Sequence, residues 1–152
     1  MNSIVNFPEL KFESFFNGKV EAKGHIVLFY PKKKTKNIKA TFTGTYKKNI
    51  LMLKEEYYDN DTAVIRNWKF NKISNHKFKG YEKNILKPFN CIIKENYLEM
   101  NYTIKTGYKN LSFYVNVKDQ MYLIDKTSLV NKSVISKFYI PIAETILFYK
   151  KL

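Results

Sequence analysis

The segment around Arg66 and Trp68 combines the only arginine and the only tryptophan of this chain. Residues two apart in a β-strand project to the same face, so a charged planar guanidinium would lie beside the largest aromatic ring. Because the chain otherwise uses lysine for positive charge, an arginine here indicates a role that needs geometry as well as charge. Arg66 could hold the carboxylate or phosphate head of a ligand. Alternatively, Trp68 packs in the core while Arg66 stacks on it or pairs with a carboxylate, for which the candidates are Asp119, Asp125 and Glu144.

A second group of polar residues lies near the C-terminal end: Asp119, Tyr122, Asp125 and Asn131. Asp119 and Asp125 share strand parity and Tyr122 faces the other way, so a regular strand cannot direct all three into one pocket. We take these four residues, with Arg66 and Trp68, as candidate ligand-binding residues; turn formation and ion pairing are the alternative. Acid–base catalysis would need carboxyls with raised pKa values in a shared cleft, and neither is visible in the sequence. No complete catalytic motif is present, and we assign no catalytic residue.

The elements that must position these residues are strands, because the apolar pattern has a period of two almost throughout. Strands are expected at 20–30, 38–46, 50–58, 63–72, 77–83, 89–95, 98–104, 111–117, 119–126, 128–137 and 142–150. Only residues 8–17 suggest a short helix. Its apolar side chains could plug the end of a barrel: Leu10, Phe12, Phe15 and Phe16.

Consecutive strands joined by short turns favour a single antiparallel up-and-down β-barrel, because closure removes unpaired edges. The interior of such a barrel is either filled by side chains or holds one small ligand. Gly24 and Gly44 fall in mid-strand and fit the sharp bends of a barrel. The sequence has no internal repeat, linker or composition break. We therefore expect one all-β domain over residues 1–152.

The charge is strongly positive: 27 Lys and Arg residues against 13 Asp and Glu, a net charge of +14. Such a surface attracts anions such as nucleic acid or anionic lipid. Abundant Lys, Asn and Ile with scarce Arg, Gly and Pro is also typical of an AT-rich genome, so the charge need not have a partner. The lysine run in residues 31–36 predicts a solvated hairpin tip, or a segment that docks on lipid headgroups. Motifs of RNA-binding sheets are absent, so a nucleic-acid partner is not expected.

Metal, cofactor and membrane-anchor signals are lacking. Cys91 stands far from His25 and His76, which gives no ligand cluster. Cys91 is expected to be a small buried hydrophobe and both histidines to be surface residues. No stretch approaches the roughly 20 apolar residues of a membrane span, and the N-terminus lacks a secretion signal. As written, the chain is expected to be cytoplasmic, without a cofactor.

Several segments together resemble a bacterial family, domain of unknown function 3833, and the resemblance spans about residues 10–150. They are residues 15–24, 43–46, 53–59, 66–68, 78–80, 121–125 and 131–138, followed by Glu144. The family's Asp-Asp-Trp-Met-Tyr stands here as Lys-Asp-Gln-Met-Tyr over residues 118–122, and its Asn-Arg as Asn-Lys at 131–132. Members are often periplasmic lipoproteins, but this chain shows no lipoprotein signal. The resemblance implies a lipocalin-like, or calycin-like, barrel of unknown biochemistry, whose members tend to occur beside fatty-acid-modifying enzymes.

Three functions remain open. The leading hypothesis is a barrel that binds a fatty acid or related lipid, with Arg66 at the acidic head and Trp68 in the cavity wall. The alternative is a ligand-free basic module that docks on anionic membrane surfaces or nucleic acid. The third is a lipid-modifying enzyme with Asp119, Tyr122 or Asp125 as acid or base. A cavity of several hundred Å³ would favour the first, and nothing in the sequence indicates the oligomeric state.

Overall fold

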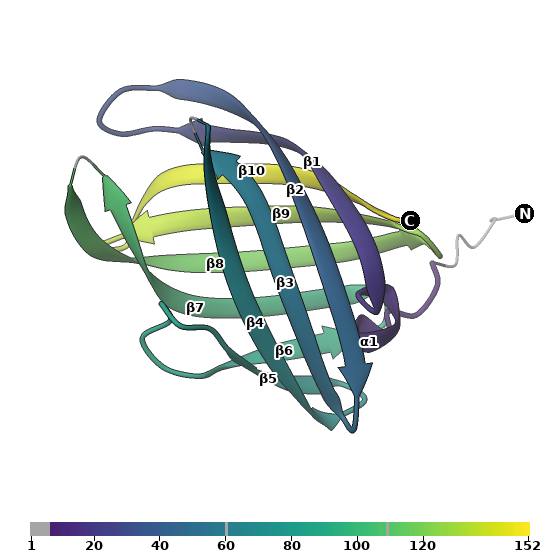
Figure 1. Cartoon of the computed structure of the whole chain (residues 1–152). Coiled ribbons are helices and arrows are strands. Elements are labelled where there is room, and N and C mark those ends of the chain that lie inside the picture. The colour runs from purple at the N-terminus through teal and green to yellow at the C-terminus, as the bar shows by residue number, and fades with distance from the viewer. Residues whose placement is uncertain (1–6, 60, 109) are drawn as a thin grey trace, which may run out of the picture.

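Alternating apolar and polar residues form ten antiparallel strands that close into a barrel in the computed structural model, which describes residues 7–59, 61–108 and 110–152 (Figure 1). The elements are α1 (Phe12–Phe15), β1 (Gly18–Leu28), β2 (Lys34–Lys47), β3 (Ile50–Asp59), β4 (Thr62–Ser74), β5 (Lys77–Tyr81), β6 (Phe89–Lys94), β7 (Tyr97–Tyr108), β8 (Leu111–Asp125), β9 (Ser128–Lys137) and β10 (Ile140–Lys151). The lipocalin-like all-β barrel with a short N-terminal helix is thus confirmed.

Closure depends on β1 and β10, which pair from Val20 opposite Lys151 to Leu28 opposite Ala143. Every other strand pairs with its neighbours in chain order, so the sheet has no open edge. One expectation was wrong: residues 111–117 and 119–126 belong to a single strand, β8. Lys118 lies at an outward position of that strand, and no turn-forming residue interrupts the alternation there.

The helix is shorter than the expected span of 8–17. It begins at Phe12 because the preceding backbone is engaged elsewhere: the Leu10 amide donates to the Glu95 carbonyl at 2.9 Å. It ends at Phe15, and Gly18, with φ of 111°, leads into β1. The four apolar side chains expected to plug the barrel are all buried: Leu10, Phe12, Phe15 and Phe16.

Phe12 lies at the centre of this plug. Its ring meets those of Phe16, Phe70 and Phe78 edge-on, with centroids 5.2, 4.9 and 5.2 Å apart. Edge-to-face packing suits the charge distribution of aromatic rings and adds to the stabilisation from burial. The plug thus joins α1 to the inner faces of β4 and β5.

Polar contacts hold α1 in place at the rim. Lys72 on β4 forms an ion pair with Glu13, 2.6 Å apart. Lys151 donates from its Nζ atom to three carbonyls at the end of α1, which belong to Ser14, Phe15 and Asn17, at 2.7, 3.0 and 2.8 Å. These bonds satisfy carbonyls that a helix end leaves without intrahelical partners.

The two mid-strand glycines allow close approach of neighbouring backbone. A Cβ atom at Gly24 would lie 1.9 Å from the carbonyl oxygen of Ile146 on β10, and one at Gly44 would lie 1.8 Å from that of Phe16. Gly24 therefore permits tight closure between β1 and β10, and Gly44 lets α1 seat against β2. Contact with a neighbouring carbonyl, which the sequence did not indicate, is what requires a glycine at each position.

The two ends of the barrel differ. One is closed by α1, and the other, which we call the mouth, carries the connections β1–β2, β3–β4, β5–β6, β7–β8 and β9–β10 (Figure 1). Inward-facing residues near the mouth, such as Ile26, Ile38, Val64 and Ile135, are only half-buried. Solvent therefore reaches the interior from this end. No helix in the described part of the chain is long and apolar enough to cross a membrane.

Candidate functional site

Strands β3 and β4 place three chemically active side chains on the inner face of the barrel. Glu55 pairs with Arg66 across the two strands, and Leu53 pairs with Trp68. The indole Nε1 of Trp68 donates to Glu55 Oε1 at 3.1 Å. Arg66 and Trp68 therefore share the inner face, as their spacing predicted.

A buried carboxyl network lies on β7, β8 and β9. Asp119 accepts hydrogen bonds from the hydroxyl of Tyr102 at 2.8 Å, from the amide of Asn131 at 3.4 Å and from the hydroxyl of Ser133. Asp119, Asn131 and Ser133 are all buried. Donors thus reach both oxygens of this carboxyl, as a buried acid requires.

The two groups meet across the barrel. The rings of Trp68 and Tyr102 lie 5.5 Å apart at 65°, and Phe89 packs against both. Trp68 also stacks on Phe70, with ring centroids 6.1 Å apart and an interplanar angle of 11°, and Phe70 in turn contacts Phe12 of the plug. We call the following set the interior cluster: Glu55, Arg66, Trp68, Tyr102, Asp119, Asn131 and Ser133. It forms a polar layer between the aromatic plug and the half-buried inward residues near the mouth.

Burial governs the electrostatics of this layer. It raises the pKa of Glu55, against the opposing effects of the Trp68 hydrogen bond and the Arg66 charge. Burial likewise raises the pKa of Asp119, although the hydrogen bonds from Ser133, Tyr102 and Asn131 oppose the shift. Both carboxyls therefore hold their protons to higher pH than they would in water.

Arg66 is the cation of the cluster, and it forms no ion pair within the described residues: no carboxylate oxygen there lies within 4.0 Å of its guanidinium. The three carboxylates considered from the sequence are committed elsewhere. Asp119 is bonded as described, Asp125 accepts from the amide of Thr127 at 2.9 Å, and Glu144 lies 3.7 Å from Lys132. Pairing of Arg66 with any of these three was therefore a wrong expectation.

The structure brings four of the six candidate residues together: Arg66, Trp68, Asp119 and Asn131. It does not bring in the other two. Tyr122 is 41% exposed on the outer wall, where its ring lies 4.9 Å from that of Tyr97. Asp125 is exposed beside the β8–β9 turn. Tyr122 points outward because of its parity on β8, and Asp125 lies outside the barrel because it is at the end of that strand. Of the three residues considered for acid–base chemistry, only Asp119 therefore lies inside the barrel.

Three members of the cluster were missed. Glu55 has the same parity as the buried Leu51 and Leu53, so extending the inward face of β3 by two residues would have found it. Tyr102 could have been found in the same way from Leu98 and Met100, which precede it on β7. Ser133 carried a weaker signal: it shares strand parity with Leu129 and Asn131, but a lone serine on a strand does not by itself indicate burial.

Other predicted residues lie where expected. Cys91 is buried, and its thiol donates to the Met100 sulfur at 3.6 Å. Burial raises the pKa of this thiol far above its ordinary value, which makes it a poor nucleophile. His25 and His76 are exposed. Across the residues that the structure covers, no three His, Cys, Asp or Glu side chains are grouped to hold a metal ion.

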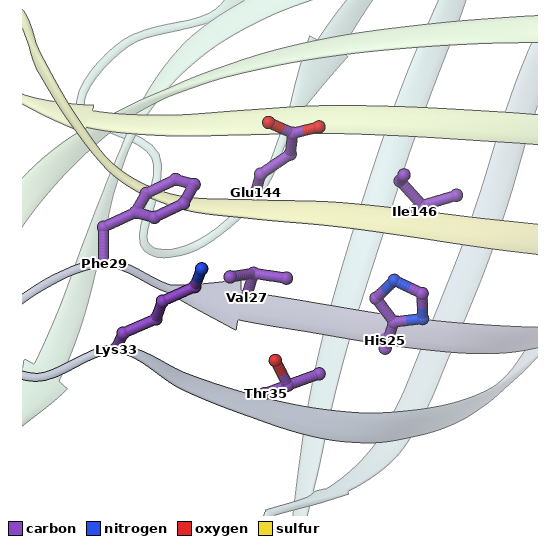
Figure 2. Close-up of a pocket in the computed structure, with 7 residues that line it drawn as sticks. All are labelled: His25, Val27, Phe29, Lys33, Thr35, Glu144 and Ile146. Carbon is purple, nitrogen blue, oxygen red and sulfur yellow. The ribbon is translucent and has the colours of Figure 1, made fainter.

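Two depressions lie on the outer wall. The smaller, about 340 Å³, is lined by His25, Val27, Phe29, Lys33, Thr35, Glu144 and Ile146 (Figure 2). The larger, about 1040 Å³, runs over β6 to β9 and is lined mainly by outward side chains, although the inward-facing Phe89, Tyr102 and Val117 also contribute. Both are broad and open to solvent, unlike the enclosed sites that bury most of a small molecule, so neither is the interior cavity that would favour a ligand inside the barrel.

Comparison with known proteins supports the architecture. A solved structure, the S-type phycobiliprotein lyase CPES from Guillardia theta, is similar over 94% of this chain and 93% of its own, with a TM-score of 0.67 and 8% identity. That likeness shows a shared fold. A search of curated proteins finds no match. A family model described as "Protein of unknown function (DUF3833)" matches residues 4–151. The chain therefore belongs to the DUF3833 family, as the resemblance of its motifs implied.

Proposed function

We propose that the protein binds an amphipathic ligand with an acidic head group, such as a fatty acid or a related lipid, inside the barrel. The observation that carries this proposal is Arg66. It faces the interior, yet no described carboxylate lies within 4.0 Å of its guanidinium. Glu55 and Asp119, the interior carboxyls of the cluster, instead accept hydrogen bonds from other side chains.

A guanidinium keeps its charge at any ordinary pH, and leaving the half-buried Arg66 without a carboxylate has an electrostatic cost that the hydrogen-bonded Tyr57 hydroxyl offsets only in part. A ligand carboxylate or phosphate would offset that cost, because two oxygens match the fork of an arginine. The raised pKa values of Glu55 and Asp119 support the same assignment. A carboxyl with a raised pKa is less ionised at a given pH than an exposed one, so it repels an anionic head less.

The surroundings of Arg66 suit an apolar tail. Toward the mouth, the inner face carries half-buried aliphatic side chains, among them Ile26, Ile38, Val64 and Ile135. A tail that leaves Arg66 toward the mouth would cover these residues and gain about 25 cal/mol for each Å² of apolar surface removed from water. Tail burial would thus supply affinity and Arg66 would select the head group.

Native mass spectrometry of delipidated protein tests the proposal, with palmitate, hexadecanol and methyl palmitate as probes. We expect a one-to-one palmitate complex and weaker adducts with the two neutral probes. Arg66→Gln should weaken palmitate binding at least about tenfold, since hydrogen bonds to charged groups contribute about 1.5–3 kcal/mol. It should leave hexadecanol binding nearly unchanged.

The matched control is Lys54→Gln, which removes one positive charge from an exposed position on the outer wall of β3, next to Glu55. Palmitate affinity should not change in this variant at physiological salt. The proposal fails if wild-type protein takes up no palmitate. It also fails if the two glutamine variants lose equal affinity, because general electrostatics would then explain binding.

A further inference from the structure

The mouth of the barrel carries exposed apolar side chains from all five of its hairpins. They are Tyr30, Tyr58, Leu86, Leu111, Phe138 and Tyr139, which we call the mouth patch. The turns at the opposite end contain only polar residues, at positions 48–49, 75–76, 95–96 and 126–127. Every hairpin of the mouth thus carries an exposed apolar side chain. At the closed end the turn residues themselves are polar, and the exposed apolar side chains there include Ile73, beside the 75–76 turn, Phe7 and Leu152.

The β9–β10 turn is the most conspicuous part of the patch. Phe138 and Tyr139 are 79% and 97% exposed, and both have positive φ, 51° and 65°. A two-residue hairpin turn with positive φ at both positions favours Asn-Gly or Asp-Gly, because a bulky side chain is strained there. The comparable turn at the closed end, Lys48–Asn49, does include an asparagine. Folding alone therefore does not account for two exposed aromatic residues at 138–139, and such strain points to a function.

Lysines surround the same end. Residues 32–34 in the β1–β2 hairpin, with Lys83 and Lys87 in the β5–β6 connection, are exposed. Lys33 and Phe29 both line the depression of Figure 2, where basic and aromatic side chains stand together at the mouth end of β1 and β2. The described acidic residues at this end are Asp59, Asp61 and Glu82, with Glu144 in the same depression, one fewer than these five lysines. The mouth thus combines apolar tips with a net positive charge.

We propose that the mouth patch docks on an anionic phospholipid bilayer. Aromatic side chains are favoured at the headgroup level of a membrane, and lysines near the surface are attracted to anionic lipids. In this arrangement Phe138 and Tyr139 enter between headgroups while residues 32–34 contact lipid phosphates. The mouth then faces the membrane. The docking surface does not include Arg66, so it stands independently of the proposed ligand site.

Sedimentation with phosphatidylcholine vesicles, with and without phosphatidylglycerol, tests the proposal. Wild-type protein should bind the anionic vesicles, and bind them less at high salt. The double variant Phe138→Asn/Tyr139→Gly should lose at least about tenfold in partitioning, because two aromatic side chains no longer enter the headgroup region. Its turn is better suited to the backbone, so its melting temperature should be unchanged or higher, which excludes misfolding as the cause.

The matched control applies the same replacement at the closed end, as Lys48→Asn/Asn49→Gly. This variant should bind vesicles like wild type. Replacement of residues 32–34 by glutamine should weaken binding by about fivefold per lysine, at low salt. Arg66→Gln should have no effect here, so failure of the ligand site and failure of the docking surface are distinguishable.

A fluorescence measurement fixes the orientation. Tyr139→Trp should give an added emission that shifts to the blue with anionic vesicles, whereas Lys126→Trp, in the β8–β9 turn, should not. Vesicle binding that survives Phe138→Asn/Tyr139→Gly would overturn the proposal. So would a blue shift confined to Lys126→Trp. Self-association that this double variant abolishes, without vesicle binding by the wild type, would show instead that the patch contacts a second copy of the chain.

Discussion

Replacement of Phe12 by alanine should open the closed end of the barrel. Phe12 is 1% exposed and meets three other rings edge-on. Truncation of a fully buried phenylalanine costs about 3–5 kcal/mol, because lost burial and a residual cavity both contribute. For a chain of this length that corresponds to roughly 10–15 °C in melting temperature. Urea unfolding followed by the emission of Trp68, the only tryptophan, measures the effect within the barrel itself.

Two further variants separate the causes. Phe12→Leu keeps most of the apolar volume but loses the edge contacts, at about 0.5–1.5 kcal/mol each, so it should be intermediate. Phe148→Ala removes the same side chain from the outer wall of β10, where it is 48% exposed, and should change stability far less. The account of α1 as a plug is refuted if Phe12→Ala is no more destabilising than Phe148→Ala.

Three more predictions concern the backbone, the buried acid and the rim. Gly24→Ala should destabilise the protein by about 1–3 kcal/mol, because the added Cβ atom would lie 1.9 Å from a carbonyl oxygen of β10. Gly107→Ala is the control: its Cβ atom would lie 3.4 Å from the nearest atom, so thermal melts should show little change. Folding raises the pKa of Asp119 above its ordinary value of 3.8. The free energy of unfolding should therefore fall as the pH rises from 3.8 through the raised pKa, because only the unfolded protein loses this proton there. Asp119→Asn should reduce this pH dependence in urea titrations between pH 3.5 and 7. Lys72→Met should cost about 1–2 kcal/mol at pH 7, between the values for exposed and buried ion pairs. Because the hydrogen bond to Glu13 raises the pKa of Lys72, this stabilisation should be lost as the pH rises through that raised pKa, and pH-dependent urea unfolding measures the loss.

Much of the fold could be predicted because a closed antiparallel barrel depends on local patterns. Alternation along each segment specifies which side chains face inward, and it placed Arg66 beside Trp68 correctly. Burial of Leu10, Phe12, Phe15 and Phe16 could be anticipated for a similar reason, since a cluster of apolar residues before the first strand needs a surface to cover. The single strand over 111–125 was divided at Lys118, although its inward positions continue without a break through Val117, Asp119 and Met121.

The interior cluster was harder to predict because it depends on which strands face each other across the barrel. Parity shows that Glu55 and Asp119 point inward, but the register of ten strands decides which inward residues share a layer. Trp68 on β4 and Tyr102 on β7 meet only because the barrel closes. Strand register also decides which carboxylates can reach Arg66, so the sequence alone could not choose among Asp119, Asp125 and Glu144.

The contacts between Lys151 and the carbonyls of α1 join residues 134 to 137 positions apart. Pairing of β1 with β10 spans nearly the same separation. Neither can form on the ribosome until β10 has been synthesised, so the edge of β1 that faces β10 stays unpaired until then, although β1 can pair with β2 and Phe12 can meet Phe70 and Phe78 earlier. Contacts of such long range also slow folding after release, because a large loop must close before they stabilise anything. Until its last strand is made, the chain is therefore an open sheet with an unpaired β1 edge, and such an edge favours pairing with other chains.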